Sequence, residues 1–178
     1  MTDSMDDGQH SEHSKTVYAH FGLAMFLAQV LEHGLVNALV FVELLPTRAG
    51  NPVPRKQWEA EFESFFERNF ETTLGKMIRN LKAATTIPSD LETILTAALT
   101  KRNFLAHNYF RERDAAFITE AGREKMIEEL QEAQALFSEA DNRLTEATKA
   151  AREKFGFTDE YLNQMFEDYL SKVKTGTK

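Results

Sequence analysis

The sequence predicts an all-α protein of one domain. Apolar residues recur at steps of three and four along most of the 178 residues, and no segment alternates apolar and polar residues as a strand does. A chain of this length can bury a sizeable core, and the absence of cysteine excludes a disulfide framework and a thiolate zinc site. We therefore expect a single helical-bundle domain over residues 14–173, built from about five or six helices.

Both ends of the chain are predicted to lie outside this domain. Residues 1–13 have no apolar periodicity and are expected to be disordered, and residues 174–178 are expected to fray. The opening residues are acidic and polar rather than a basic segment followed by a cleavable apolar one, so the expected location is cytoplasmic. His10 and His13 make a poor metal site without further ligands, and we predict no metal and no cofactor.

The first predicted helix spans residues 14–45 and is closed by Pro46 and a turn-rich segment. Its apolar residues cover nearly its whole circumference, which is typical of a helix that is buried on more than one side. Polar residues interrupt the run well before the ~18 uninterrupted apolar residues that a membrane span requires, so no membrane segment is predicted. We expect this helix to lie at the centre of the bundle and to contact a second copy of the chain in a homodimer.

Five further segments have the helical period. Aromatic residues along 55–69 indicate a core face, although aromatics interleaved with cations can also stack nucleic-acid bases. Ser89, with Glu92 at the capping-box position, is predicted to open the helix that runs to Arg113. A long C-terminal amphipathic helix steps by four and three without exception, which indicates packing on the bundle or pairing between chains. The segments are 55–69, 71–84, 89–113, 119–155 and 158–173, and the long stripe is Met126, Leu130, Ala133, Phe137, Ala140, Leu144, Ala147 and Ala151.

Polar and cationic side chains gather on one stretch, KRNFLAHNYFRER, from Lys101 to Arg113. Asn103 and His107 are four residues apart, so they share one face of a helix, with Phe110 and Arg111 one turn further along. Arg102 falls on an adjoining, otherwise apolar face, where a cation normally needs a carboxylate partner or an opening onto a cleft or interface. The candidate partner is Glu32, which lies on the main apolar stripe of the first helix.

The same region is the positive part of an acidic chain. The formal net charge is −7, yet residues 76–113 contain seven Lys and Arg against three Asp and Glu. An acidic surface repels phosphates, which argues against a broad nucleic-acid-binding surface. A localised site for an anionic substrate fits this charge distribution better, with Lys101, Arg111 and Arg113 as candidate substrate-binding residues.

The string Arg102-Asn103-Phe104-Leu105-Ala106-His107 resembles the motif of the HEPN superfamily, the helical domains of many prokaryotic toxin and defence ribonucleases. That motif is an arginine, commonly followed by a polar residue, and a histidine four to six positions further on. The resemblance covers about residues 15–145. It implies a HEPN-like helical bundle and a metal-independent endoribonuclease that acts on RNA, with Arg102, Asn103 and His107 as catalytic residues. It also implies that the motif helices of two copies face each other across a two-fold axis and share a composite site.

Other functions remain open on the sequence alone. The cluster also suits a non-catalytic helical module that binds a nucleotide, an RNA or a partner protein such as an antitoxin. A satisfied structural pair of the neighbouring Arg102 and His107 is a further interpretation. A purely structural coiled coil explains the long helix but not the polar cluster. The discriminating observation is whether Arg102 and His107 reach a solvent-accessible cleft or lie sealed against Glu32.

Overall fold

The computed structural model describes residues 3–176 of the chain, with side chains described from Glu12 onward. The predicted all-α class is confirmed, because this part of the chain contains helices and no strand. The elements are α1 (Asp3–Leu39), η1 (Val40–Leu44, a π-helix), α2 (Leu45–Ala49), α3 (Arg55–Phe70), α4 (Leu74–Ala84), α5 (Ser89–His107), α6 (Tyr109–Glu112), α7 (Asp114–Ile118), α8 (Glu120–Glu153) and α9 (Asp159–Thr175).

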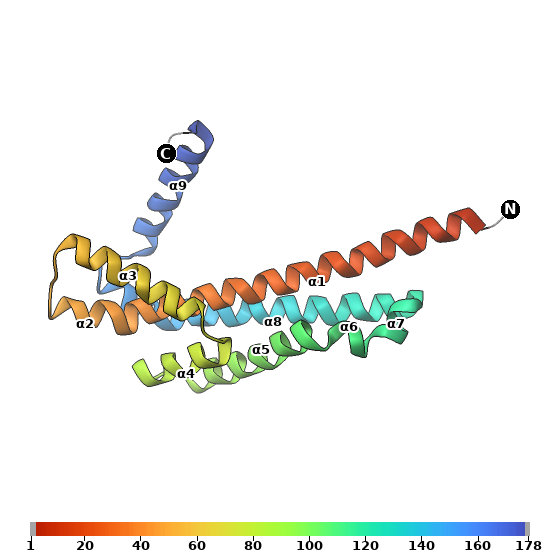
Figure 1. Ribbon diagram of the computed structural model, residues 1–178, viewed down its shortest axis with the longest axis horizontal. Helices are drawn as coiled ribbons and strands as arrows, with labels where there is room; N and C mark the ends of the chain where they lie inside the picture. Colours follow the sequence, from red (N-terminus) through yellow and green to blue (C-terminus); the bar gives the residue numbers. More distant parts are fainter. Residues whose placement is uncertain (1–2, 177–178) are drawn as a thin grey trace.

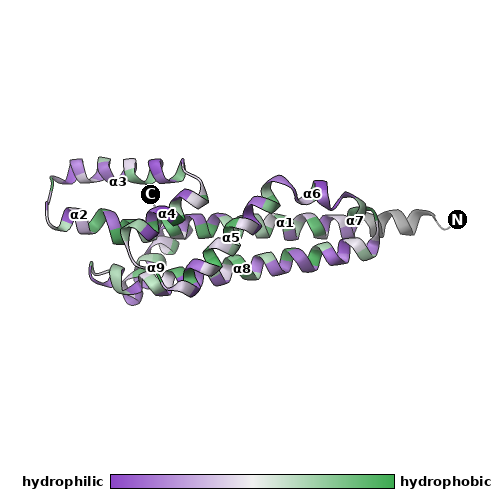
Figure 2. Ribbon diagram, turned by 90° about the horizontal axis from the view of Figure 1, so that it is seen from below, coloured by the Kyte–Doolittle hydropathy of each residue, from purple (hydrophilic) through white to green (hydrophobic). Residues whose placement is uncertain are grey.

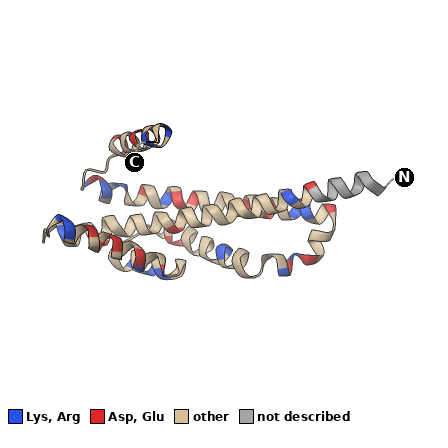
Figure 3. Cartoon of the chain, turned by 45° about the horizontal axis from the view of Figure 1, so that its top comes forward, with Lys and Arg blue, Asp and Glu red and all other residues tan. Residues whose placement is uncertain are grey.

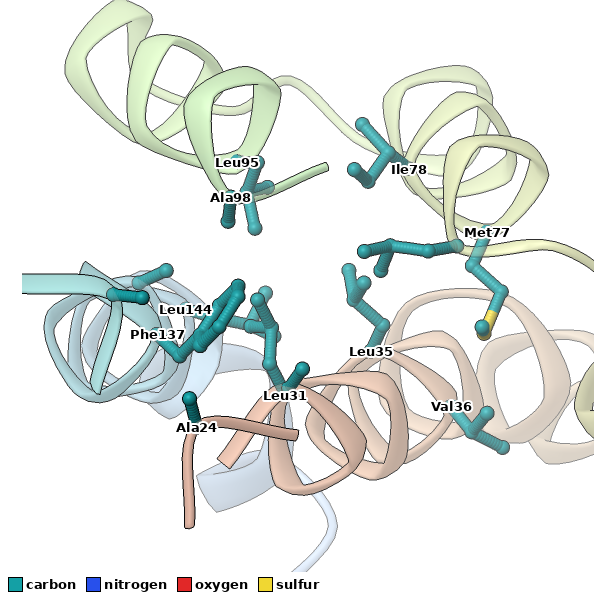
Figure 4. Close-up of a cluster of buried hydrophobic side chains, with 14 of the residues drawn as sticks. Ala24, Leu31, Leu35, Val36, Met77, Ile78, Leu95, Ala98, Phe137 and Leu144 are labelled. Atoms are coloured by element: carbon teal, nitrogen blue, oxygen red, sulfur yellow. The ribbon is translucent and has the colours of Figure 1, made fainter. Parts of the chain in front are cut away.

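The two longest helices, α1 and α8, lie side by side along the length of the molecule (Figure 1). Helices α4 and α5 pack against this pair, and α3 contacts α1 near one end of the bundle. The core lies where α1, α4, α5 and α8 meet, around Leu35, Met77, Leu95 and Phe137 (Figure 4). All four side chains are at most 2% exposed. Because α1 contacts α3, α4, α5 and α8, it is the central helix of the bundle.

Hydrophobic and hydrophilic residues alternate along α8 (Figure 2). The stripe is buried as the spacing predicts from Met126 to Leu144, whereas Ala147 is exposed and Ala151 is half-buried. Thr148 and Arg152 are buried instead. A straight helix turns by about 20° per heptad relative to a strict seven-residue repeat, and after three heptads the buried face therefore passes to the next residues.

Three expectations about helix ends need correction. The backbone of α1 is helical from Asp3, where disorder was expected through His13, because no proline stops the helix from extending beyond its packed part. Residues 1–2 and 177–178 lie outside the described residues. The side chains of residues 1–11 also lie outside them, so the structure does not test the expectation about His10. At the other end α9 continues to Thr175, and Gly176 ends it with a positive φ of 66°. Pro88 rather than Ser89 precedes α5, and no side chain caps that helix.

The segment from Glu12 to Ala49 is long and apolar enough to cross a membrane by length and composition alone. A core helix of a soluble protein meets the same criterion. Leu31, Leu35 and Leu39 within this segment are fully buried in the bundle, whereas Leu23 and Phe26 on the opposite side are exposed. The segment is therefore accounted for as a core helix with one uncovered apolar side.

Candidate functional site

Arg102 and Glu32 form an ion pair between α5 and α1. The Nε group of Arg102 donates a hydrogen bond to Oε1 of Glu32 over 3.0 Å. The two side chains are 29% and 19% exposed, so the pair is neither sealed in the core nor free in solvent. The predicted partnership of these two residues is confirmed, and it accounts for a cation on an otherwise apolar face.

The hydrogen bond from Nε uses only part of the Arg102 guanidinium. Among the described residues, no group accepts a hydrogen bond from its Nη1 or Nη2. A guanidinium presents five N–H groups in a fixed fork and is well suited to phosphate oxygens. Glu32 therefore orients Arg102 through one edge and leaves the other edge available to a ligand.

Helix α4 does not cover the part of α5 that carries Arg102. Gly75, in the first turn of α4, packs so closely on α5 that a Cβ there would lie 3.3 Å from Cδ2 of Leu99. The ion pair between Lys82 and Glu92 shows that α4 runs antiparallel to α5 from that point. The amino end of α4 therefore lies about one turn before Arg102, and α5 continues beyond the cover of α4. An amino end of a helix also favours anions nearby.

Asn103 and His107 are both exposed on α5, on the face that their four-residue spacing predicts. His107 is the last residue of α5, because Asn108 leaves the helical conformation with φ −129° and ψ −20°. The expectation of one continuous helix to Arg113 was wrong at this point. Asparagine readily adopts non-helical backbone conformations, and the break turns the following residues toward α1.

Phe110 and Arg111 consequently do not continue the face of Asn103 and His107. Phe110 lies on α6, where its ring packs against Phe21 and Tyr18 of α1 with centroid distances of 4.9 and 5.7 Å. Arg111 donates a hydrogen bond from Nη2 to Oδ1 of Asn108 over 2.7 Å and is exposed. Arg111 is thus four residues from His107 in the sequence but lies on a separate short helix.

The other two candidate substrate-binding residues point elsewhere. Arg113 donates two hydrogen bonds to the Glu129 carboxylate of α8, over 2.9 and 3.1 Å. The hydrogen bond with Glu129 raises the pKa of the Arg113 guanidinium. Lys101 lines a hollow with Thr100 and Leu136 on the α8 side of α5. The structure therefore does not gather these cations around Arg102, and nothing in the spacing of the acidic residues of α8 singled out Glu129.

Arg102 and His107 face different directions on α5. Five residues correspond to about 140° of rotation and ~7.5 Å of rise along an α-helix. Arg102 reaches toward α1, while His107 is exposed at the end of α5. One copy of the chain therefore does not direct both side chains at one point, whereas two copies facing each other can.

Several apolar side chains of α1 are exposed. Tyr18, Leu23 and Phe26 are 54%, 46% and 58% exposed. Of these, Tyr18 lies beside the motif, because it contacts Phe110, which follows His107 by three residues. Leu23 and Phe26 lie about 180° and 120° around α1 from Glu32, the residue that faces Arg102. They therefore face away from the motif.

Two other features of the described residues do not add to the site around Arg102: the distribution of charge and an apolar cavity. Figure 3 shows acidic and basic residues interspersed along the bundle, without a continuous basic face in that view. A cavity of about 640 Å³ lies among α1, α3, α8 and the start of α9, and its lining does not include Arg102, Asn103 or His107.

Comparison with known protein families, curated proteins and solved structures finds no match for the chain. The function is therefore inferred from the residues of the motif and their geometry.

Proposed function

We propose that the protein is a metal-independent endoribonuclease of the HEPN toxin and defence type. The observation that carries this proposal is the Arg102 guanidinium, held by Glu32 through Nε, on the same helix as the exposed Asn103 and His107. These residues supply a fixed cation, a proton-transfer group and an amide, which two copies facing each other can bring together. These are the groups that cleavage of RNA by its own 2′-hydroxyl requires.

The reaction follows from the chemistry of these groups. The ribose 2′-oxygen attacks the adjacent phosphorus as its proton is removed, and the bond from phosphorus to the 5′-oxygen breaks as that oxygen is protonated. His107 moves a proton in this exchange. Arg102 stabilises the negative charge that builds on the phosphate oxygens, and Asn103 orients the phosphate or the imidazole. The products are a 2′,3′-cyclic phosphate and a free 5′-hydroxyl.

The site is proposed to be shared by two copies of the chain. Because Arg102 and His107 of one copy diverge around α5, each active site combines Arg102 of one copy with His107 of the other. The exposed side chain of Tyr18, which contacts Phe110, supports contact between copies on this side. A homodimer of this kind places the two motif helices around the same RNA strand.

One observation favours a second candidate function. Glu32 neutralises part of the charge of Arg102, and the chain as a whole carries a net charge of −7. A non-catalytic module that binds RNA or a partner protein such as an antitoxin needs less charge stabilisation than a transition state does. In that case residues 101–113 provide recognition without cleavage.

The test is cleavage of RNA by purified protein in the presence of EDTA. The proposal expects cleavage with cyclic-phosphate ends, and resistance of a strand whose scissile ribose is 2′-deoxy. Arg102→Ala and His107→Ala are each expected to lose activity by a factor on the order of 10² or more, and Asn103→Ala is expected to lose less.

Arg48→Ala is the matched control. Arg48 is 30% exposed and lies 2.7 Å from Glu61, so it resembles Arg102 in exposure and in facing a carboxylate, although this pair is not hydrogen-bonded and is not part of the motif. It should keep its activity. Equal activity of wild type and an Arg102→Ala/His107→Ala double variant would contradict the proposal. Binding of RNA or a partner through residues 101–113 without cleavage would favour the second candidate.

A further inference from the structure

Helix α9 leaves the bundle with its apolar face uncovered. Figure 1 shows it projecting away from the other helices. Its apolar side chains lie on one face at helical spacing, and six of them are between 37% and 63% exposed. These six residues, here the α9 stripe, are Tyr161, Leu162, Met165, Phe166, Tyr169 and Val173. A solvated face of this composition is typical of a helix that binds another surface.

The start of α9 is fixed to its own chain. Phe157 packs edge-on against Phe41 with a centroid distance of 5.2 Å. Asp159, in the first turn of α9, pairs with Lys149 over 2.6 Å and with the buried Arg152. Arg152 also donates a hydrogen bond to the carbonyl oxygen of Phe157. These contacts set the angle at which α9 departs, so α9 cannot fold back onto its own bundle without breaking them.

An apolar groove opens beside this fixed point. It is the cavity of about 640 Å³, and its walls come from α1 and η1, α3 and α8. Phe41, Trp58, Phe62 and Phe66 provide aromatic surface, and Leu144 lies on the opposite wall. Of the α9 stripe only Leu162 reaches it. The chain therefore presents an uncovered apolar helix and an uncovered apolar groove, and holds them apart.

We propose that the α9 stripe of one copy binds in the groove of a second copy, and that the second copy returns the same contact. The lengths match: α9 has 17 residues and α3, which forms one wall, has 16, and each is ~25 Å long at 1.5 Å per residue.

The contact area is sufficient for a stable dimer. Three aromatic and three aliphatic side chains, each about half exposed, give on the order of 500 Å² of apolar area on α9. Two such helices contribute on the order of 1,000 Å², and the smaller surface of the two grooves adds to it, so the total lies at the lower end of the range for specific interfaces. Because each copy binds the other in the same way, the exchange gives a closed two-fold dimer. Both grooves are then occupied, so further copies cannot add to form a filament.

This exchange does not depend on the ribonuclease proposal, because it shares no residue with Arg102, Asn103 or His107.

The absence of native cysteine makes the contact directly testable. One full-length variant carries Met165→Cys on the α9 stripe, and a second carries Thr145→Cys, an exposed residue that lines the groove. The two are mixed under conditions in which light scattering shows that the wild type associates, and are treated with a short bismaleimide. The expected product is a covalent heterodimer of the two variants. RNA cleavage is not read in this experiment, so its outcome is separate from that of the ribonuclease test.

Ser171→Cys is the control for Met165→Cys, since it lies on the opposite face of α9 and nearly preserves side-chain size. It should give little heterodimer with Thr145→Cys. Three results would overturn the exchange. The wild type remains a monomer throughout the micromolar range, or Met165→Cys links mainly to itself, or a Met165→Cys/Thr145→Cys double variant links only within one chain.

Discussion

Arg102 on α5 and Glu32 on α1 are 70 residues apart in the sequence and are joined by a 3.0 Å hydrogen bond from Nε to Oε1. Each lies on the apolar side of its own helix, so each would be a poorly solvated charge without the other. The pair connects the motif helix to the central helix of the bundle. It also leaves the Nη groups of Arg102 without an acceptor among the described residues, which is why we treat the pair as part of a site rather than as a structural contact alone.

The first prediction concerns this pair. Glu32→Gln should lower the free energy of unfolding by about 1–2 kcal/mol, less than for a fully buried pair because both side chains retain some solvent exposure. It should also reduce RNA cleavage, since Arg102 is no longer held in one orientation. Thermal denaturation and the cleavage assay measure the two effects.

Glu61→Gln provides the comparison, because Glu61 pairs with Arg48 at a similar exposure of 26%. It is expected to lower stability by a similar amount without changing cleavage. If Glu32→Gln changes neither stability nor cleavage, the pair has no role in the fold or in the site.

The second prediction concerns Asp141 on α8, which lies against α1 at Gly34, where an added Cβ would overlap its Oδ1 atom. Burial raises the pKa of the Asp141 carboxyl. A carboxyl that binds its proton more tightly in the folded state favours folding at low pH, and this contribution is lost as the pH rises through its folded-state pKa. Asp141→Asn should therefore raise Tm at neutral pH, and the gain should shrink as the pH falls toward 4, near the ordinary range for aspartate.

Denaturation of both proteins between roughly pH 4 and 8 checks this, within the range where carboxyl titration is separable from global acid unfolding. Asp90→Asn serves as the control, because Asp90 is exposed beside Arg143. A gain from Asp141→Asn that is the same at every pH would show that the carboxylate charge is not the cause.

The third prediction uses two glycines of opposite behaviour. An added Cβ at Gly122, near the start of α8, would overlap the backbone carbonyl of Ala116, whereas an added Cβ at Gly22 in α1 has no atom within 4 Å. Gly122→Ala should therefore destabilise the protein by about 1–3 kcal/mol. Gly22→Ala should stabilise it by about 0.5–1 kcal/mol, because alanine is the better helix former. Chemical denaturation measures both, and the same sign for the two variants would contradict the packing of α7 on α8.

The parts of the fold that apolar spacing controls could be predicted from the sequence. The core stripe from Met126 to Leu144 is buried as expected, and the placement of Glu32 and Arg102 on apolar faces correctly paired them. Both depend on the periodicity of one helix at a time, which is visible in the sequence.

The parts that depend on contacts between helices could not be predicted. The break at Asn108 is accompanied by packing of Phe110 on Tyr18 and Phe21, and no spacing rule joins residues so far apart. The pairing of Arg113 with Glu129 likewise follows from the position of α8 beside α6 and α7. The sequence therefore predicted the partner of Arg102 correctly, whereas the continuation of the helix beyond His107 was wrong.

The most direct test of the composite ribonuclease is complementation between two inactive variants. Arg102→Ala and His107→Ala chains are co-expressed with different affinity tags, and the heterodimer is purified through both and assayed on RNA with EDTA present. If each site combines Arg102 of one copy with His107 of the other, one of the two sites is intact, and roughly half of the wild-type activity returns. A heterodimer as inactive as either variant alone, while the wild type cuts RNA, would contradict the shared site, and a wild type that cuts no RNA would contradict the ribonuclease itself.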